Sequence, residues 1–92
     1  MTRSLIQRQA GEWRQTLERV GRTLYPEYAW NVAGGCAREA VRVGVSKDGT
    51  NAVYRIHLAD LMKMERQKKN RDQVAIHVAT NALAVWERIR DV

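Results

Sequence analysis

The sequence predicts an α+β fold made of an N-terminal helix, a three-stranded antiparallel sheet, a short helix and a C-terminal helix, in that order. Two stretches, at 6–24 and 74–89, carry apolar residues every three or four positions, which is typical of helices. Between them, apolar residues alternate with polar or small ones, which is typical of strands. Because 92 residues suffice for one hydrophobic core, we expect residues 1–92 to form a single basic α+β domain.

The first helix is predicted from one apolar face that continues for five turns. Its members are Ile6, Ala10, Trp13, Leu17, Val20 and Leu24. Thr2 or Ser4 can cap its start, and Pro26 ends it because proline lacks the backbone N–H. The opposite face is charged, which favours a helix with one side on the core and the other in solvent. A coiled-coil dimer is less favoured, because three heptads with Gly21 inside are short.

The sheet is predicted over residues 28–58, with turns at two places. Gly34 and Gly35 suit a tight hairpin turn, which places Trp30 opposite Glu39. A second turn at 46–49 places Val43 opposite Ala52. One face is expected to be buried and to include Trp30, Val41, Val43, Tyr54 and Ile56. The other face collects polar and basic residues. Residues 36–41 are also compatible with a short helix, because several of them are poor strand formers.

Two helices are predicted after the sheet. Leu58, Leu61 and Met62 suggest a short helix capped by Asp60. The last helix is expected to open near Asp72. Its apolar positions are Val74, Val78, Ala82, Val85 and Ile89, with Ala75, Ala79 and Trp86 beside them. This helix is predicted to form the second helical part of the core.

The charge balance points to a polyanionic partner. Sixteen Lys and Arg against ten Asp and Glu give a net charge of +6, and twelve of the sixteen are Arg. The planar guanidinium group binds phosphate or carboxylate with two parallel hydrogen bonds, where lysine offers a point charge. A basic composition can also serve solubility alone. The clustering of the charges favours binding.

Two clusters of cations are the candidate phosphate-binding sites. The first is Lys63, Arg66, Lys68, Lys69 and Arg71, before and at the N-terminus of the last helix, which is itself a favourable place for phosphate. The second is Arg38, Arg42 and Arg55 on the polar sheet face. Such sets match phosphates along a strand and lose affinity as salt rises. Phe is absent and the aromatic residues are assigned to the buried face, so backbone contact is favoured over base stacking.

The sequence gives little support for catalysis. We find no phosphate-binding glycine loop and no nucleophile motif, so we expect no enzyme, cofactor or metal. Asp60, Glu65 and His57 could meet as a metal-dependent nuclease site, but a helix cap, a surface acid and a sheet-face histidine need no coincidence. Cys36 is the only cysteine, which excludes an intramolecular disulfide and fits a reducing cytoplasm. No apolar run approaches the length that spans a bilayer.

The element order, with Lys68 and Lys69 before an alanine-rich terminal helix, resembles a double-stranded RNA-binding domain. The similarity extends from about Leu17 to Ile89, and it implies that the two lysines touch phosphates across a groove. Two features depart from that family. The loop after the first strand lacks its histidine-containing motif, and an extra segment at 59–67 separates the sheet from the lysines.

A small, basic α+β domain without an active-site motif is also similar to the phage-encoded anti-CRISPR proteins. That resemblance implies a ribonucleoprotein partner, namely a type I-F CRISPR surveillance complex in the cytoplasm of the host cell, whose hybridisation with target DNA is blocked. The function predicted first is therefore a non-enzymatic module that contacts RNA or a ribonucleoprotein. The alternative is a protein-only interaction or dimerisation module that docks on an acidic partner.

Overall fold

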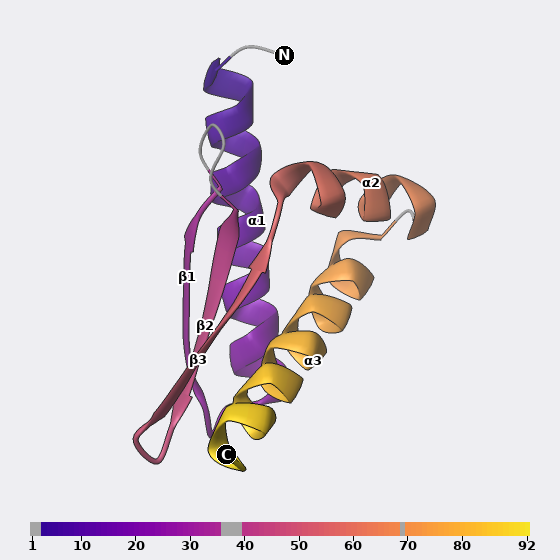
Figure 1. The fold of residues 1–92 in the computed structure, drawn as a ribbon. Helices are drawn as coiled ribbons and strands as arrows, with labels where there is room; N and C mark the ends of the chain where they lie inside the picture. Colours follow the sequence, from indigo (N-terminus) through magenta and orange to yellow (C-terminus); the bar gives the residue numbers. More distant parts are fainter. Residues whose placement is uncertain (1–2, 36–39, 69) are drawn as a thin grey trace.

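The computed structural model describes residues 3–35, 40–68 and 70–92. Its elements are α1 (Arg3–Leu24), β1 (Ala29–Gly34), β2 (Val41–Lys47), β3 (Thr50–Ile56), α2 (Leu58–Lys68) and α3 (Arg71–Arg90). The strands form one antiparallel sheet in the order β1-β2-β3, and α1 and α3 pack against each other and against one face of it (Figure 1). The predicted α+β fold and its order of elements are confirmed.

The inner face of the sheet forms the core together with the two long helices. Its buried members are Trp30, Val32, Val41, Val43, Val45 and Ala52. The predicted burial of Trp30, Val41 and Val43 is thus confirmed. Tyr54 and Ile56 share this face but are only half-buried at its margin, where they pack against the core cluster.

The turn between β2 and β3 is tighter than predicted. Asp48 and Gly49 form a two-residue turn, and both have left-handed backbone angles, with φ of 52° and 79°. An Asp-Gly pair suits this turn because both central positions require a positive φ. Val43 consequently faces Tyr54 rather than Ala52. The predicted register was wrong by two positions, which leaves every side chain on its predicted face, because the side-chain period of a strand is two.

The connection between β1 and β2 is longer than predicted. Trp30 faces Val45, not Glu39, so the tight turn expected at the glycine pair is wrong. The two glycines, with φ of 83° and 87°, instead lie at the end of β1, and the Gly35 N–H donates to the Ala40 carbonyl at 3.2 Å. Position 41 belongs to β2, whereas the strand-or-helix alternative for residues 36–39 lies outside the described residues.

The buried face of α1 is one turn shorter than predicted. Ala10, Trp13, Leu17 and Val20 are buried, but Leu24 is 43% exposed at the helix end. Ser4 lies inside the helix and so does not cap it, and Thr2 lies outside the described residues. The helix ends before Pro26, as expected.

Gly21 marks the closest approach of α1 to the sheet. A Cβ atom at this position would lie only 2.5 Å from the ring of Trp30. That ring is held in place, because its Nε1–H donates to the Tyr25 carbonyl at 3.1 Å and it stacks on the Tyr25 ring. The glycine inside the helix is therefore required by packing, although it lowers helix propensity.

The starts of α2 and α3 depend on different residues than predicted. The His57 carbonyl accepts from the backbone N–H groups of Asp60 and Leu61, so α2 begins after His57 and Asp60 lies in its first turn instead of capping it. Asn70 caps α3: its backbone is extended, and its side chain accepts from the Gln73 N–H at 3.2 Å. Asparagine is among the preferred residues for this position.

Two buried tryptophans occupy opposite ends of the core. The Nε1–H of Trp86 in α3 donates to the Thr50 carbonyl at 2.9 Å and ties the helix to the start of β3. Trp13 in α1 is fully buried, and its indole N–H has no acceptor among the described residues. Of the apolar positions predicted for α3, Ile89 is wrong, since it is 45% exposed near the C-terminus.

Candidate nucleic-acid interface

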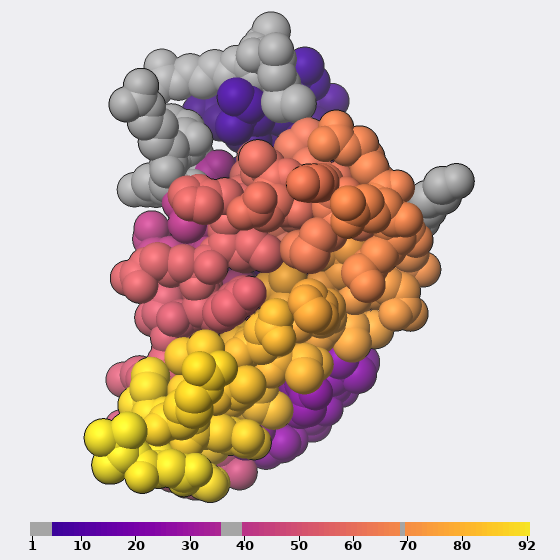
Figure 2. Space-filling model, turned by 45° about the vertical axis from the view of Figure 1, so that its right-hand side comes forward, coloured from indigo at the N-terminus to yellow at the C-terminus, as the bar shows by residue number. Residues whose placement is uncertain are grey.

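Helix α2 presents three exposed cations. Leu61 is fully buried and anchors the helix on α3, while Lys63, Arg66 and Lys68 project from its other sides. Within the described residues, none of the three makes a hydrogen bond or an ion pair with another side chain. Figure 2 shows one side of α2 uncovered at the upper right of the molecule, next to the start of α3.

Arg71 was predicted to belong with these cations, but its guanidinium group turns inward. Its Nε donates to Glu65 at 2.9 Å, its Nη1 donates to Glu12 at 3.1 Å, and its Nη2 lies 3.4 Å from the Gln9 amide oxygen. The group also lies 5.0 Å from the ring centroid of Trp13. Arg71 thus connects α1, α2 and α3, and its donors are occupied by the protein.

The pKa of Arg71 reflects these contacts. The hydrogen bond to Glu65 raises it most, partial burial lowers it, and the hydrogen bond to Glu12 and the two carboxylate charges raise it further. A raised pKa in the folded state means that the contribution to stability is complete below the ordinary arginine value and is lost only as the pH rises through the folded value. Arg71 therefore stays charged at neutral pH, and its contacts with Glu12 and Glu65 form a clamp that joins the three helices.

The N-terminus of α3, predicted as a phosphate site, is partly occupied by the protein's own groups. The Asn70 side chain accepts from the Gln73 N–H, which is one of the free N–H groups of the first turn. Asp72 adds a carboxylate to the first turn and pairs with Arg19 of α1 at 2.8 Å. An acidic residue here satisfies the positive end of the helix dipole. We therefore place the candidate phosphate contacts on the surface of α2.

The second predicted cluster lies on the outer face of the sheet, away from the helices. Arg42 of β2 and Arg55 of β3 are directly opposite each other in the register, which brings them closer than the sequence indicated. Arg55 is exposed and Arg42 is half-buried. Arg38, the third predicted member, and Lys69 of the first cluster lie outside the described residues, as does Cys36.

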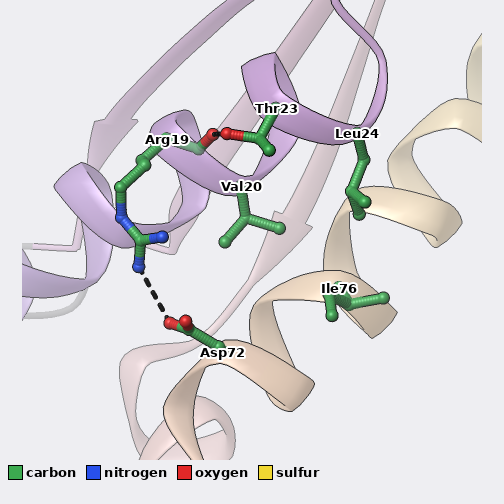
Figure 3. A pocket seen from close by; sticks show the side chains of 6 residues that line it. All are labelled: Arg19, Val20, Thr23, Leu24, Asp72 and Ile76. Carbon is green, nitrogen blue, oxygen red and sulfur yellow. Dashed lines mark hydrogen bonds and ion pairs between the residues drawn. The ribbon is translucent and has the colours of Figure 1, made fainter.

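A separate apolar groove lies between α1 and α3. Figure 3 shows Val20 and Leu24 of α1 facing Ile76 of α3, with the Arg19–Asp72 ion pair closing one end. The groove measures about 160 Å³. Its lining and size suit one apolar side chain of a partner protein, as the protein-only alternative requires.

The described part of the chain holds no group of three or more His, Cys, Asp or Glu residues placed to bind a metal ion. Glu65, one of the three residues of the nuclease alternative, is paired with Arg71. None of the described helices combines the length and the apolar character needed to cross a membrane.

Sequence reasoning missed the partners that determine which cations are available. Glu12 and Gln9 reach Arg71 from 59 and 62 residues away, and no local pattern indicates such contacts. The opposition of Arg42 and Arg55 was obtainable, because the Asp-Gly pair at 48–49 is the usual signal for a two-residue turn.

No protein family, no curated protein and no solved structure matches this chain. The resemblances to double-stranded RNA-binding domains and to anti-CRISPR proteins accordingly stay predictions from the sequence.

Proposed function

We propose that the protein is a non-enzymatic module that binds the phosphate backbone of RNA, free or within a ribonucleoprotein. One observation carries the proposal: Lys63, Arg66 and Lys68 of α2 are exposed without an anionic partner among the described residues. Two acids of this region are engaged elsewhere, since Glu65 binds Arg71 and Asp72 binds Arg19, while Asp60 is exposed in the first turn of α2. The positive charge is therefore concentrated at the C-terminal end of α2, at Arg66 and Lys68.

A purely structural role accounts for these cations only in part. Arg66 and Lys68 lie in the last turn of α2, where positive charge stabilises a helix by about 0.3–1 kcal/mol. Lys63 lies earlier and gains little from that effect. With a rise of about 1.5 Å and a rotation of about 100° per residue, Lys63 and Lys68 are separated by about 7.5 Å along the axis and about 140° around it, so a strand that contacts both would have to pass across the helix.

The resemblance to anti-CRISPR proteins directs the proposal to one kind of ribonucleoprotein. A CRISPR surveillance complex exposes guide-RNA phosphates along the path that target DNA must follow. A basic module that occupied those phosphates would obstruct hybridisation of the target DNA. RNA binding by the isolated protein is the part of this proposal that is tested first, because it needs no knowledge of the complex.

The test is RNA affinity in a charge-matched pair of variants. We expect the triple substitution of Lys63, Arg66 and Lys68 by Gln to weaken binding of a labelled single-stranded RNA about 100-fold at 0.1 M salt, because three counterion contributions of about 0.7 each act over one decade of salt. Fluorescence anisotropy measures the dissociation constant.

The control is the triple substitution of Arg8, Arg22 and Arg88 by Gln. These exposed residues lie on α1 and α3, and the substitution lowers the net charge by the same amount. We expect a loss of less than about 5-fold. Equal losses in both variants would show that only net charge matters. If wild-type protein bound no RNA, the protein-only module would take first place, with the groove between α1 and α3 as its docking site.

A further inference from the structure

The outer face of the sheet is arranged in three cross-strand rows. Read across β1, β2 and β3, they are Ala29, Ser46 and Asn51, then Asn31, Gly44 and Val53, and finally Ala33, Arg42 and Arg55. Both long helices pack on the opposite face, so no described helix covers these rows (Figure 1). The shape of this face is therefore determined by the side chains of the three strands themselves.

The second and third rows enclose a hollow of about 340 Å³. Its floor is low because Gly44, in the middle of the central strand, carries no side chain. Asn31 and Val53 stand on either side, and Val53 is 43% exposed, although it is apolar. A glycine inside a strand weakens it and often marks a place where a ligand approaches the backbone.

Packing also bears on this glycine. A Cβ atom at position 44 would lie 3.1 Å from the Asn31 carbonyl oxygen, a tight contact with a backbone atom of the neighbouring strand. The contact is less severe than at Gly21, where the added atom would meet the Trp30 ring at 2.5 Å. The absence of a side chain at position 44 thus serves strand packing and also keeps the hollow open.

The charge at one end of the hollow favours an anion. Arg42 and Arg55 occupy directly opposed positions, with an expected Cα separation of about 4.5–5.5 Å. None of the nine residues in the three rows is acidic, and Arg55 is exposed. An anion above Arg55 would therefore find a complementary charge.

We propose that the hollow binds one nucleotide of a single-stranded RNA. The base lies flat over Gly44 against Val53, the Asn31 amide faces the edge of the base, and Arg55 holds the adjoining phosphate, with Arg42 adding positive potential. The proposal rests on the proposed RNA-binding function and extends it, since the cations of α2 contact phosphates only. It gives the protein a preference for unpaired RNA, because a paired base cannot enter the hollow.

The shape favours a nucleotide over other anions. At about 340 Å³ the hollow is near the lower end of the range for ligand sites, about 300–1,000 Å³, which suits one nucleotide and not a longer stretch. A free phosphate would leave the apolar wall at Val53 unused. The side chains of an acidic peptide include no aromatic ring comparable to a base, which would lie flat over Gly44.

The test compares a short labelled single-stranded RNA with an otherwise identical abasic oligonucleotide. In wild-type protein, we expect the intact RNA to bind at least 5-fold more tightly, because stacking and edge contacts are lost with the bases. In Gly44→Ala, which raises the floor, this preference should fall to less than 2-fold. Ser46→Ala, in the row without arginine, should keep it. Thermal unfolding of each variant confirms that it is folded.

A second variant keeps the test decisive should Gly44→Ala not fold. Arg55→Gln should weaken binding of the intact RNA at least 5-fold and lower the slope of log affinity against log salt by about 0.7, the value for one phosphate on a single strand. Equal affinity for the intact and abasic oligonucleotides in wild-type protein would overturn the proposal. So would competition by inorganic phosphate or by a glutamate decapeptide at the concentrations at which a mononucleotide competes.

The two proposals fail separately. The triple α2 variant should lose overall affinity while keeping the preference for intact over abasic RNA. Gly44→Ala should lose that preference while keeping the contribution of α2 to the salt dependence. If RNA affinity fell steeply with salt but intact and abasic oligonucleotides bound equally well, the proposed function would stand and the nucleotide site would be refuted.

Discussion

Replacing Arg71 by alanine should destabilise the fold by about 2 kcal/mol. The Arg71 side chain is 28% exposed, and it binds the side chains of Glu65, which is 30% exposed, and Glu12, which is 46% exposed. Partly screened ion pairs of this kind contribute about 0.5–1 kcal/mol each, and the contact with the ring of Trp13 adds about 0.5–1 kcal/mol. For a domain of this size, a loss of 2 kcal/mol lowers the melting temperature by about 10 °C.

The assay is urea unfolding followed by tryptophan fluorescence, with Arg66→Ala as the matched control. Arg66 is exposed and has no partner among the described residues, so its substitution should cost at most the helix-end contribution of about 0.3–1 kcal/mol, which is below the value for Arg71. RNA affinity should show the reverse order, with Arg66→Ala weakening binding and Arg71→Ala leaving it unchanged below its melting temperature. A cost below about 0.5 kcal/mol for Arg71→Ala would refute the clamp.

Two pairs of variants test the packing. On α1, Gly11→Ala should stabilise the protein by about 0.5–1 kcal/mol, because the added Cβ meets nothing closer than 3.8 Å. Gly21→Ala should instead cost about 1–3 kcal/mol, because its Cβ collides with the Trp30 ring. Equal effects of the two substitutions in thermal unfolding would contradict this. Trp86→Phe should cost about 1 kcal/mol more than Trp13→Phe, because the Trp86 indole donates a hydrogen bond to the Thr50 carbonyl, whereas the Trp13 indole has no acceptor among the described residues. A lower denaturant midpoint for Trp13→Phe than for Trp86→Phe would contradict this.

The sequence was sufficient for the fold and for the faces of the sheet, but not for the register. Apolar periodicity identified each helix and strand, and Arg42 and Arg55 were assigned to the correct face although both predicted turns were misplaced. The errors were even numbers of residues, which preserve the face. Which side chains stand directly opposite each other depends on turn geometry, and an Asp-Gly pair carries more information there than a pair of glycines.

The candidate site was predictable only in part, for a physical reason. Lys63, Arg66 and Lys68 were correctly predicted to lie in a polar, basic segment, since helix periodicity distinguishes them from the buried Leu61. Arg71 was indistinguishable from them, because its distinguishing partner Glu12 is on α1. Whether a cation binds a partner or stabilises the fold is decided by long-range packing, which local sequence patterns do not report.

The most direct test of RNA binding through α2 is the salt dependence of affinity. For a single-stranded RNA, we predict that substituting Gln for Lys63, Arg66 and Lys68 together flattens the plot of log affinity against log salt by about 2 units, from three contacts of about 0.7 each. The fold should be unchanged, since all three side chains are exposed. An unchanged slope, with the protein folded and binding RNA, would contradict the proposal that α2 holds the phosphates.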